Sequence, residues 1–598
     1  MKKSFLLLIV LLSLLTVSVC SAQDVVSNLP KIDNTKWQYN ADDNVYYQLG
    51  ISYCENPADE SYENLAIFVP GAYLTGTDNG DGTYTCEINS DGAAGIYTAA
   101  TAPVVMPINT PGYSAMSPLS SYSSLTSYTD EGFIYVHAGC RGRDHGAPAG
   151  VTDLKAAIRY IRYCADVLPG DTDSIFTFGM SGGGAQSALM GSTGDSDMYT
   201  PYLEAIGAVQ GVSDAVLGAM CWCPITNLDS ADEAYEWMMG ITRSGLSDED
   251  QAISDRLAYA FADYINRAGI KDPAGNVLTL EVSDEGIFQA GSYYDYMLTV
   301  VEGSLSNFLE DTEFPYTVSN SSNGGGRGGF GGQKPDGMPE GGFGRNISDG
   351  QMPDNDGFAG GESDEMIETN ESREVNYEEI DDITRNETSS GVSLSGTYGT
   401  IQDYIDAMNV NREWVTYDAE TGTVKITSVA DFVSAFKSAS KNLGAFDQLD
   451  AGQGENTLFG YGDGSGAHFD AVLAAILYDL GNEYAADYSE DLAKTDSLGN
   501  TFDYRLNMYT PLYFLLESEE GYGTSNVAKY WRIRTGIAQG DCALSTEVNL
   551  ALALENYEGV ESVDFETIWG AGHTQAERTG SSTDNFIAWV NEIMSVEL

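Results

Sequence analysis

Short apolar runs and amphipathic helical segments alternate along the chain. Apolar and polar positions alternate over residues 45–70, which predicts two antiparallel strands. Residues 102–108 and 132–137 are short, almost continuous apolar runs, typical of strands buried in a parallel sheet. Residues 153–168 carry apolar side chains at helical spacing, with Asp153 near the expected start, where the helix dipole favours an anion. This part of the chain therefore predicts strands joined by helices.

The same alternation continues to the middle of the chain and returns near its carboxyl end. Residues 174–179 have the pattern of a strand, and a helix opens at residues 185–190. Later, the pattern predicts a strand at 530–534, a helix at 546–554 and a strand at 562–569. Strands alternating with helices predict an α/β fold: a mostly parallel sheet with helices on both faces.

The stretch between these two parts has a different pattern. Residues 238–500 are polar and mainly helical, which suggests a lid inserted between core strands. Within it, residues 320–390 are glycine-rich and then acidic, so they cannot bury enough apolar area to offset chain entropy, and we expect disorder there. The predicted core then consists of a first part at 23–237 and a second part at 501–598.

The first residues predict the destination of the protein. Residues 1–22 combine a positive start, an apolar run at 5–17 and a small-residue exit, as in a secretory signal peptide cleaved near Ala22. A lipoprotein signal acylated at Cys20 is the alternative, although Val19 before it is larger than the usual residue. We expect a secreted or extracytoplasmic protein with no membrane contact after cleavage.

Charge excludes several classes of partner. The 598 residues include 89 Asp and Glu against 28 Lys and Arg, for a net charge of −61. A protein that binds nucleic acid or an anionic membrane needs clustered Lys and Arg side chains, so neither is an expected partner. The composition fits an acidic protein with a well solvated surface. Oligomeric state stays open.

The positions of the cysteines permit one disulfide and do not match a metal site. Cys54 and Cys86 lie in the early strand region and could pair. Cys221 and Cys223 lack the two-residue spacer and the second pair of a zinc site. We expect no metal and no organic cofactor.

The strongest chemical signal is a G-x-S-x-G pentapeptide centred on Ser181, between a predicted strand and a predicted helix. That context is the one a nucleophile elbow requires, because the turn lifts the serine hydroxyl clear of the sheet. The Gly182 N–H at the helix start would form half of an oxyanion hole, and the loop after residues 102–108 would supply the other half through Gly112 or Tyr113. The alternative is a glycine-rich turn with an idle serine.

Only four histidines are available as the general base. His573 follows the last predicted strand, where a fold with an elbow serine places its base. His468 lies in the inserted region, where a lid or structural role is expected. His137 and His145 precede the serine and are expected to shape the loop after their strand.

The acid should follow a strand between the serine and the histidine. Asp541 does so, after the strand at 530–534, and would hold the His573 imidazole in its tautomer and stabilise the imidazolium. Asp229 and Asp232 are alternatives, because some hydrolases take the acid from that earlier position.

Several longer phrases make the chain resemble a known family. It is similar to the bacterial tannases (secreted tannin acyl hydrolases) and to feruloyl esterases within the α/β-hydrolase superfamily. The phrases are GCRGRD at 139–144, the elbow pentapeptide, CPITNLD at 223–229, ADEAYEW at 231–237, LFG at 458–460 and WRIR at 531–534. The resemblance implies a serine carboxylesterase that cleaves small phenolic esters, such as galloyl esters, with Ser181, Asp541 and His573 as its triad.

The resemblance also implies substrate-binding residues in the lid. Lys441 and Glu455 are spaced like the lysine and glutamate that bind the phenolic hydroxyls in the family; the alternative is solvated surface charge. The family has a second aspartate two residues after the acid, and here Ala543 holds that position if Asp541 is the acid. If Asp541 is instead the ring-binding residue, Gln539 holds the acid position, where it cannot do the same electrostatic work.

Three classes of function follow from the sequence. The first is a secreted esterase acting on phenolic esters. The second is a serine peptidase of the same fold, which would share the elbow and the triad. The third is a non-catalytic binding protein that retains a hydrolase core.

Overall fold

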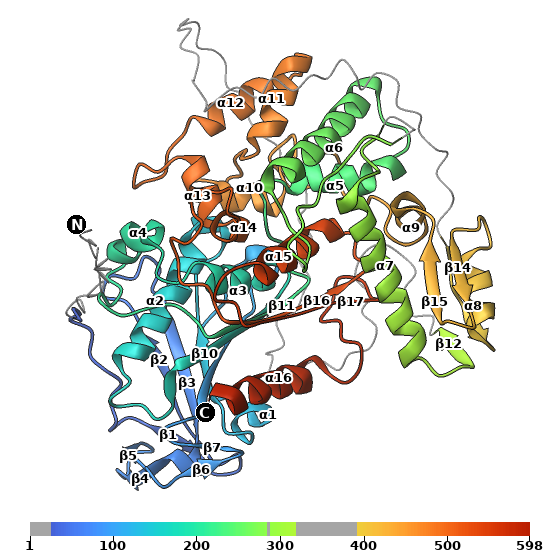
Figure 1. Cartoon of the computed structure of the whole chain (residues 1–598). Helices are drawn as coiled ribbons and strands as arrows, with labels where there is room; N and C mark the ends of the chain where they lie inside the picture. The colour runs from blue at the N-terminus through green and yellow to red at the C-terminus, as the bar shows by residue number, and fades with distance from the viewer. Residues whose placement is uncertain (1–24, 284–286, 319–391, 598) are drawn as a thin grey trace, which may run out of the picture.

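A sheet of nine strands forms the centre of the computed structural model, which describes residues 25–283, 287–318 and 392–597 (Figure 1). The predicted signal peptide and the low-complexity segment lie outside the described residues and stay predictions. Neighbouring strands follow the order β1-β2-β3-β9-β8-β10-β11-β16-β17. Their bounds are β1 (Gln38–Asn40), β2 (Val45–Ser52), β3 (Asn64–Pro70), β8 (Pro103–Ile108), β9 (Ile134–Ala138), β10 (Asp171–Met180), β11 (Gly218–Trp222), β16 (Tyr530–Gly536) and β17 (Ser562–Ile568).

The direction of the strands divides the sheet into two parts. β1, β2 and β3 are antiparallel to their neighbours, whereas β9, β8, β10, β11, β16 and β17 are parallel. The predicted antiparallel pair and all five predicted parallel strands are therefore confirmed. Since β16 pairs directly with β11, the two parts of the core predicted on either side of the inserted region form one sheet.

Helices cover both faces of this sheet. α1 (Thr126–Thr129) and α16 (Ser582–Glu597) lie together on one face, and α2 (Ala149–Tyr163), α3 (Gly182–Ser192) and α15 (Leu544–Glu555) lie on the other (Figure 1). The predicted α/β fold with helices on both faces is confirmed.

One helix begins earlier than the sequence indicated. α2 starts at Ala149, so Asp153 does not lie at the helix start. Its carboxylate is fully buried and accepts a hydrogen bond of 2.6 Å from the Arg141 guanidinium. The ion pair, and not the helix dipole, therefore accounts for this anion.

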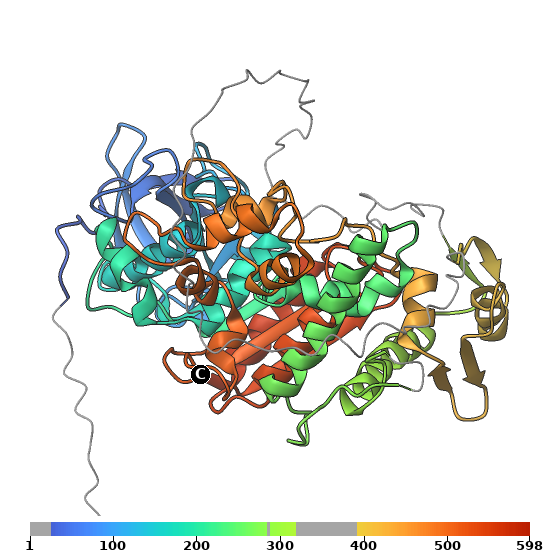
Figure 2. The same ribbon diagram turned by 90° about the horizontal axis from the view of Figure 1, so that it is seen from above.

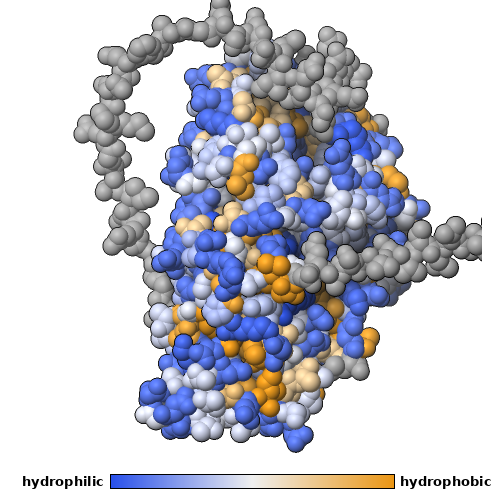
Figure 3. Space-filling view, turned by 90° about the vertical axis from the view of Figure 1, so that its left-hand side faces the viewer, coloured by the Kyte–Doolittle hydropathy of each residue, from blue (hydrophilic) through white to orange (hydrophobic). Residues whose placement is uncertain are grey.

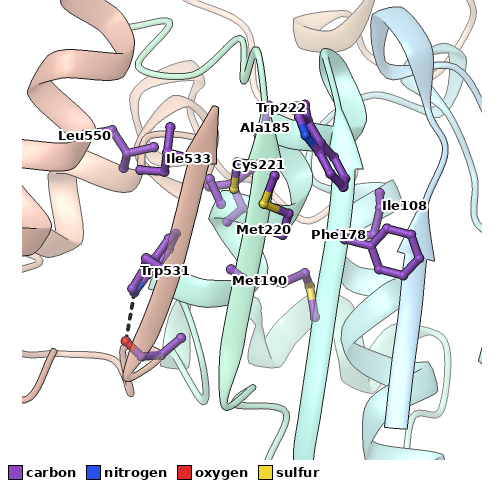
Figure 4. Packing of buried hydrophobic residues seen from close by; sticks show 14 of the residues in the cluster. Ile108, Phe178, Ala185, Met190, Met220, Cys221, Trp222, Trp531, Ile533 and Leu550 are labelled. Carbon is purple, nitrogen blue, oxygen red and sulfur yellow. Dashed lines mark hydrogen bonds between the residues drawn. The ribbon is translucent and has the colours of Figure 1, made fainter. Parts of the chain in front are cut away.

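Large side chains pack against both faces of the central strands (Figure 4). Trp531 of β16 faces α3, on which Met190 is buried. Met220 of the adjacent β11 points to the other face and lies beside Arg532; all three methionine and tryptophan side chains are almost fully buried. The Trp531 indole N–H donates to Ala528 O at 2.8 Å, so the buried ring carries no unpaired polar group. This packing fixes the strand ends at which the candidate site lies.

Helices dominate the inserted region, as predicted. Its helices and those that lead back to the sheet are α5 (Ala231–Met239), α6 (Asp248–Ala268), α7 (Ser292–Asp311), α8 (Ile401–Met408), α9 (Val429–Phe436), α10 (Gly454–Phe459), α11 (Ala471–Leu480), α12 (Ala485–Leu492), α13 (Phe502–Met508) and α14 (Pro511–Leu515). The sequence analysis did not predict two small antiparallel strand pairs there: β12 (Tyr316–Val318) with β13 (Gly396–Tyr398), and the hairpin of β14 (Val415–Asp418) and β15 (Thr423–Ile426). Figure 2 shows the segment with α8, β14 and β15 in gold at one end of the molecule.

The possible disulfide between Cys54 and Cys86 does not form. The backbone of Cys54 forms an isolated antiparallel β-bridge with that of Ala208. Cys86 lies instead opposite Gly76 in the hairpin of β4 (Leu74–Asp78) and β5 (Tyr84–Ile88). All seven cysteines of the described residues are buried and free. The two thiols lie in different substructures, which spacing along the chain did not reveal.

The surface agrees with the acidic composition. On the face drawn in Figure 3, hydrophilic residues predominate and hydrophobic ones occur in small, separate groups. Within the described ranges, no helix is both long and apolar enough to span a bilayer.

Candidate functional site

Ser181 stands on a sharp turn at the carboxyl end of β10, directly before α3. Its φ is +60°, in a region that side-chain-bearing residues rarely occupy. The turn is held because Ser181 N–H donates to Trp222 O of the neighbouring strand at 3.0 Å. The strained backbone, the strand before it and the helix after it are the features of a nucleophile elbow.

The loop after β8 packs directly on this elbow. A Cβ atom on Gly182 would lie 2.5 Å from Tyr113 N and 3.2 Å from Gly112 N, so only glycine permits the approach. Tyr113 N–H already donates to Thr110 O at 2.9 Å. Gly112 N–H is therefore the better placed of the two predicted donors to complete an oxyanion hole with Gly182.

His573 reaches the site from the loop after β17. The loop reaches the end of β11, two strands away, where the Cys223 thiol donates to Thr574 O at 3.2 Å. Burial lowers the pKa of His573; Asp541 acts against this, while the charges of Lys437 and Lys441 lower the pKa further. A neutral imidazole at neutral pH is the form that a general base requires.

Two side chains approach Nδ1 of His573, and they are not equivalent. Gln539 Oε1 lies 2.6 Å away, the distance of a strong hydrogen bond. The nearest oxygen of Asp541 lies 3.6 Å away, beyond hydrogen-bond range, and half of its side chain is exposed. The structure therefore brings Asp541 next to His573, but Gln539 makes the contact that orients the ring.

A buried polar group lies behind Gln539, and the sequence analysis did not identify it. Gln539 Nε2 donates to Glu547 Oε1 and to Thr535 Oγ1, the latter at 2.8 Å. Lys437 is buried as well, and its ammonium donates to Gln539 O. One signal was available: Glu547 is the only acidic residue among the otherwise apolar and small positions at the start of α15.

Both predicted lid residues lie near the site. Lys441 Nζ lies 3.7 Å from the centre of the Phe446 ring, and its charge acts on His573. Glu455 is buried at the start of α10, and its charge helps to raise the pKa of the buried Tyr113, after burial itself. The two side chains therefore approach from the base side and from the oxyanion-loop side.

The two alternative acids belong to a different cluster. Asp232 accepts hydrogen bonds of 2.9 Å from the backbone N–H groups of Phe446 and Asp447, so it anchors the lid loop to α5. Burial raises its pKa to about 7. Asp229 acts electrostatically on Glu233 and Tyr264. The charges that act on His573 come from Asp541, Lys437 and Lys441 instead.

The other three histidines have local partners. His468 Nδ1 lies 2.7 Å from Asp447 Oδ1 inside the lid, and His137 Nε2 lies 2.9 Å from Ser117 O. His145 lies 3.3 Å from Asp144. In the described ranges, no group of three His, Cys, Asp or Glu side chains has the arrangement of a metal site.

Comparison with known proteins places this geometry in context. The family model described as BD-FAE matches residues 97–249, a stretch that includes Ser181 and ends before Gln539 and His573. No curated protein sequence matches the chain.

Solved structures of tannases match over almost the whole chain. The tannase of Fusobacterium nucleatum is 23% identical, with 96% of this chain and 98% of that chain covered and a TM-score of 0.63. The tannin acyl hydrolase of Lactobacillus plantarum is 23% identical, with 95% and 97% covered and a TM-score of 0.60. A tannin acyl hydrolase in complex with ethyl gallate is 24% identical, with 92% and 94% covered and a TM-score of 0.58. The chain has the fold of these enzymes, which confirms the resemblance at the level of the fold.

Proposed function

We propose that the protein is a serine carboxylesterase that cleaves small phenolic esters through an acyl-enzyme on Ser181. The observation that carries this proposal is the strained elbow at Ser181, packed against the Gly112 loop, together with an imidazole held at Nδ1 in a loop at the carboxyl end of the same parallel sheet. A φ of +60° costs about 1–3 kcal/mol at a residue with a side chain. A serine without a function would not require this backbone conformation.

The reaction would proceed in two steps. His573 Nε2 takes the proton of Ser181 as Oγ attacks the ester carbonyl, and the N–H groups of Gly112 and Gly182 bind the oxyanion. The imidazolium returns its proton to the leaving alcohol. Water, activated by the same nitrogen, then releases the carboxylic acid and the free Ser181 hydroxyl.

The surrounding side chains support a phenolic acyl group. Because Gln539 makes the bond to His573, Asp541 keeps a half-exposed carboxylate beside the site. With Lys441 and Glu455, it forms a set of one cation and two anions that suits several phenolic hydroxyls, each of which donates and accepts hydrogen bonds. A tannin acyl hydrolase of the same fold is solved with ethyl gallate.

The test of the nucleophile is Ser181→Ala. We expect the loss of nitrophenyl ester hydrolysis by a factor of at least about 10⁴, with an unchanged melting temperature. Ser306→Ala on α7 is the matched control, because that hydroxyl donates to Glu302 O within its own helix, away from the site. Undiminished hydrolysis by the Ser181 variant would eliminate the assignment.

The substrate class is tested by comparing methyl gallate, methyl ferulate and a chromogenic peptide at equal concentrations. We expect kcat/KM to be highest for an ester with a hydroxylated ring, because Lys441, Glu455 and Asp541 would bind the ring hydroxyls. Cleavage of the peptide in preference to both esters would favour a serine peptidase instead.

We also propose that the protein is exported and acts outside the cytoplasm. The support is the amino-terminal pattern and the acidic, well solvated surface. Amino-terminal sequencing of the exported protein should begin after Ala22; full-length protein confined to the cytoplasm would contradict export.

A further inference from the structure

A continuous series of hydrogen bonds leads from the proposed base into the core. His573 Nδ1 is bonded to Gln539 Oε1 at 2.6 Å, and Gln539 Nε2 is bonded to Glu547 Oε1. Glu547 is fully buried in the first turn of α15. The carboxylate that an acid position normally holds is thus absent from the first contact of the imidazole and present at the second.

We propose that Glu547 is a positioning residue that performs the electrostatic work of the triad acid through the amide of Gln539. The proposal rests on the ester-hydrolase function given above. It explains how the site can operate with glutamine where a triad places aspartate.

The amide can transmit the influence of Glu547 because its two ends differ. An ionised carboxylate only accepts hydrogen bonds, so Glu547 requires the NH₂ end of Gln539. The carbonyl end must then face His573, and Nδ1 must carry a proton to donate to it. This leaves the lone pair on Nε2, the nitrogen that has to take the Ser181 proton. Reversal of the amide would place the proton on Nε2 and remove the base.

Three hydrogen-bond donors and one cation favour the ionised form of Glu547, against the effect of its burial. Its Oε1 accepts hydrogen bonds from Gln539, from Thr535 Oγ1 at 2.9 Å and from the Cys542 thiol at 3.3 Å. Burial raises the pKa of Glu547, and the nearby Lys437 ammonium counteracts that increase. The amino end of α15 also favours an anion. The other titratable groups whose charges act around this site are the thiols of Cys223 and Cys542 and the carboxylate of Asp541.

Glu547 Oε2 has a different status. It is buried and has no hydrogen-bond partner in the part of the chain that the structure describes. An unpaired buried carboxylate oxygen costs stability, and native structures keep few of them without a functional reason. Here the functional reason is that the buried oxygen belongs to a carboxylate that holds a fixed negative charge behind the base.

Only one proton is transferred in each step of the proposed reaction. The proton of Ser181 Oγ moves to His573 Nε2 and later to the leaving alcohol. His573 Nδ1 keeps its own proton throughout and donates it to Gln539 Oε1. Neither Gln539 nor Glu547 gains or loses a proton, and the negative charge of Glu547 stabilises the imidazolium through the polarised amide.

The first test is Glu547→Gln, which keeps the shape and an acceptor oxygen but removes the charge. We expect kcat to fall about 10- to 100-fold with KM little changed, the range seen when a partner that orients a functional imidazole is lost. The acid limb of the kcat/KM profile should move to lower pH, because a lost anion lowers the pKa of His573. Glu555→Gln, on the exposed end of the same helix, is the control and should match the wild type.

The decisive test exchanges the two groups: Gln539→Glu combined with Glu547→Gln. A carboxylate then bonds His573 directly, an amide bonds the carboxylate from behind, and net charge and volume are conserved. We expect kcat of the double variant to return to within about threefold of the wild type, since orientation and charge are both restored. A purely structural role for Glu547 predicts instead that the losses of the two single variants add.

The outcomes separate this proposal from the proposed function. A Glu547→Gln enzyme with wild-type kcat and pH profile overturns the positioning role. A double variant with a kcat as low as that of Glu547→Gln overturns it too. In either case, labelling of Ser181 by a fluorophosphonate in the wild type would leave the esterase function intact. If Glu547→Gln fails to fold, the nitrogen NMR signals of His573 in the wild type decide: a proton on Nδ1 is expected, and a proton on Nε2 contradicts the proposal.

Discussion

The buried carboxylate of Asp232 makes the stability of the protein depend on pH in a predictable direction. Its two oxygens hold the backbone of Phe446 and Asp447, and burial raises its pKa from 3.8 to about 7. At about 1.4 kcal/mol for each tenfold change in proton affinity, this increase corresponds to about 4 kcal/mol. Because the folded-state pKa is the higher one, the unfolded chain releases the proton first as pH rises. Stability is therefore lost between about pH 4 and pH 7.

The substitution Asp232→Asn removes this ionisation. Between about pH 5 and pH 8 the wild type loses about 3 kcal/mol of stability through this ionisation, and the variant does not. We therefore expect the free energy of unfolding of the variant, minus that of the wild type, to rise by about 3 kcal/mol over this range. Urea unfolding of both proteins at several pH values measures the difference, in which the contributions of groups that do not interact with Asp232 cancel. Asp81→Asn is the control: hydrogen bonds from Thr83 lower the pKa of this exposed carboxyl, so its difference should be flat over the same range. A flat difference for Asp232→Asn would refute the reasoning.

Two further predictions concern the site itself. Gly182→Ala places a Cβ 2.5 Å from Tyr113 N and should displace the oxyanion loop, with a loss of about 10²–10³ in kcat, the cost of one oxyanion donor. Its control is Gly303→Ala on α7, where the new Cβ meets nothing within 4 Å and activity should be unchanged; equal kcat in both variants would rule out the loop as a donor. Lys441→Met should lower kcat/KM for methyl gallate about tenfold, as expected when a charged hydrogen bond is lost. Because the charge of Lys441 lowers the pKa of His573, the same variant should move the acid limb to higher pH, and a limb that stays in place would contradict this contact.

Most of the fold could be predicted from the sequence because its strands are buried on both faces and its helices are amphipathic. Runs such as residues 102–108 have one stable environment, the interior of a parallel sheet. The hairpin of β14 and β15 was missed because each strand has only four residues, too few for an alternating pattern to stand out inside a helical stretch.

The elbow and the base could be predicted because each follows directly from a strand end. Ser181 directly follows β10, and His573 follows β17 after a short turn. The acid loop is different: Gln539 and Asp541 are two residues apart, and the path of the loop decides which of them meets the imidazole. Glu547 was missed because its role depends on a side chain from another element, Gln539, and not on any spacing relative to His573.

The central claim is that Ser181 is an activated nucleophile, and covalent labelling tests it most directly. The wild-type protein is treated with a fluorophosphonate at neutral pH, and the modified peptide is mapped by mass spectrometry. We predict a single phosphonylated residue, Ser181, with parallel loss of esterase activity and no labelling after heat denaturation. A folded protein that hydrolyses phenolic esters while Ser181 remains unmodified would contradict the account.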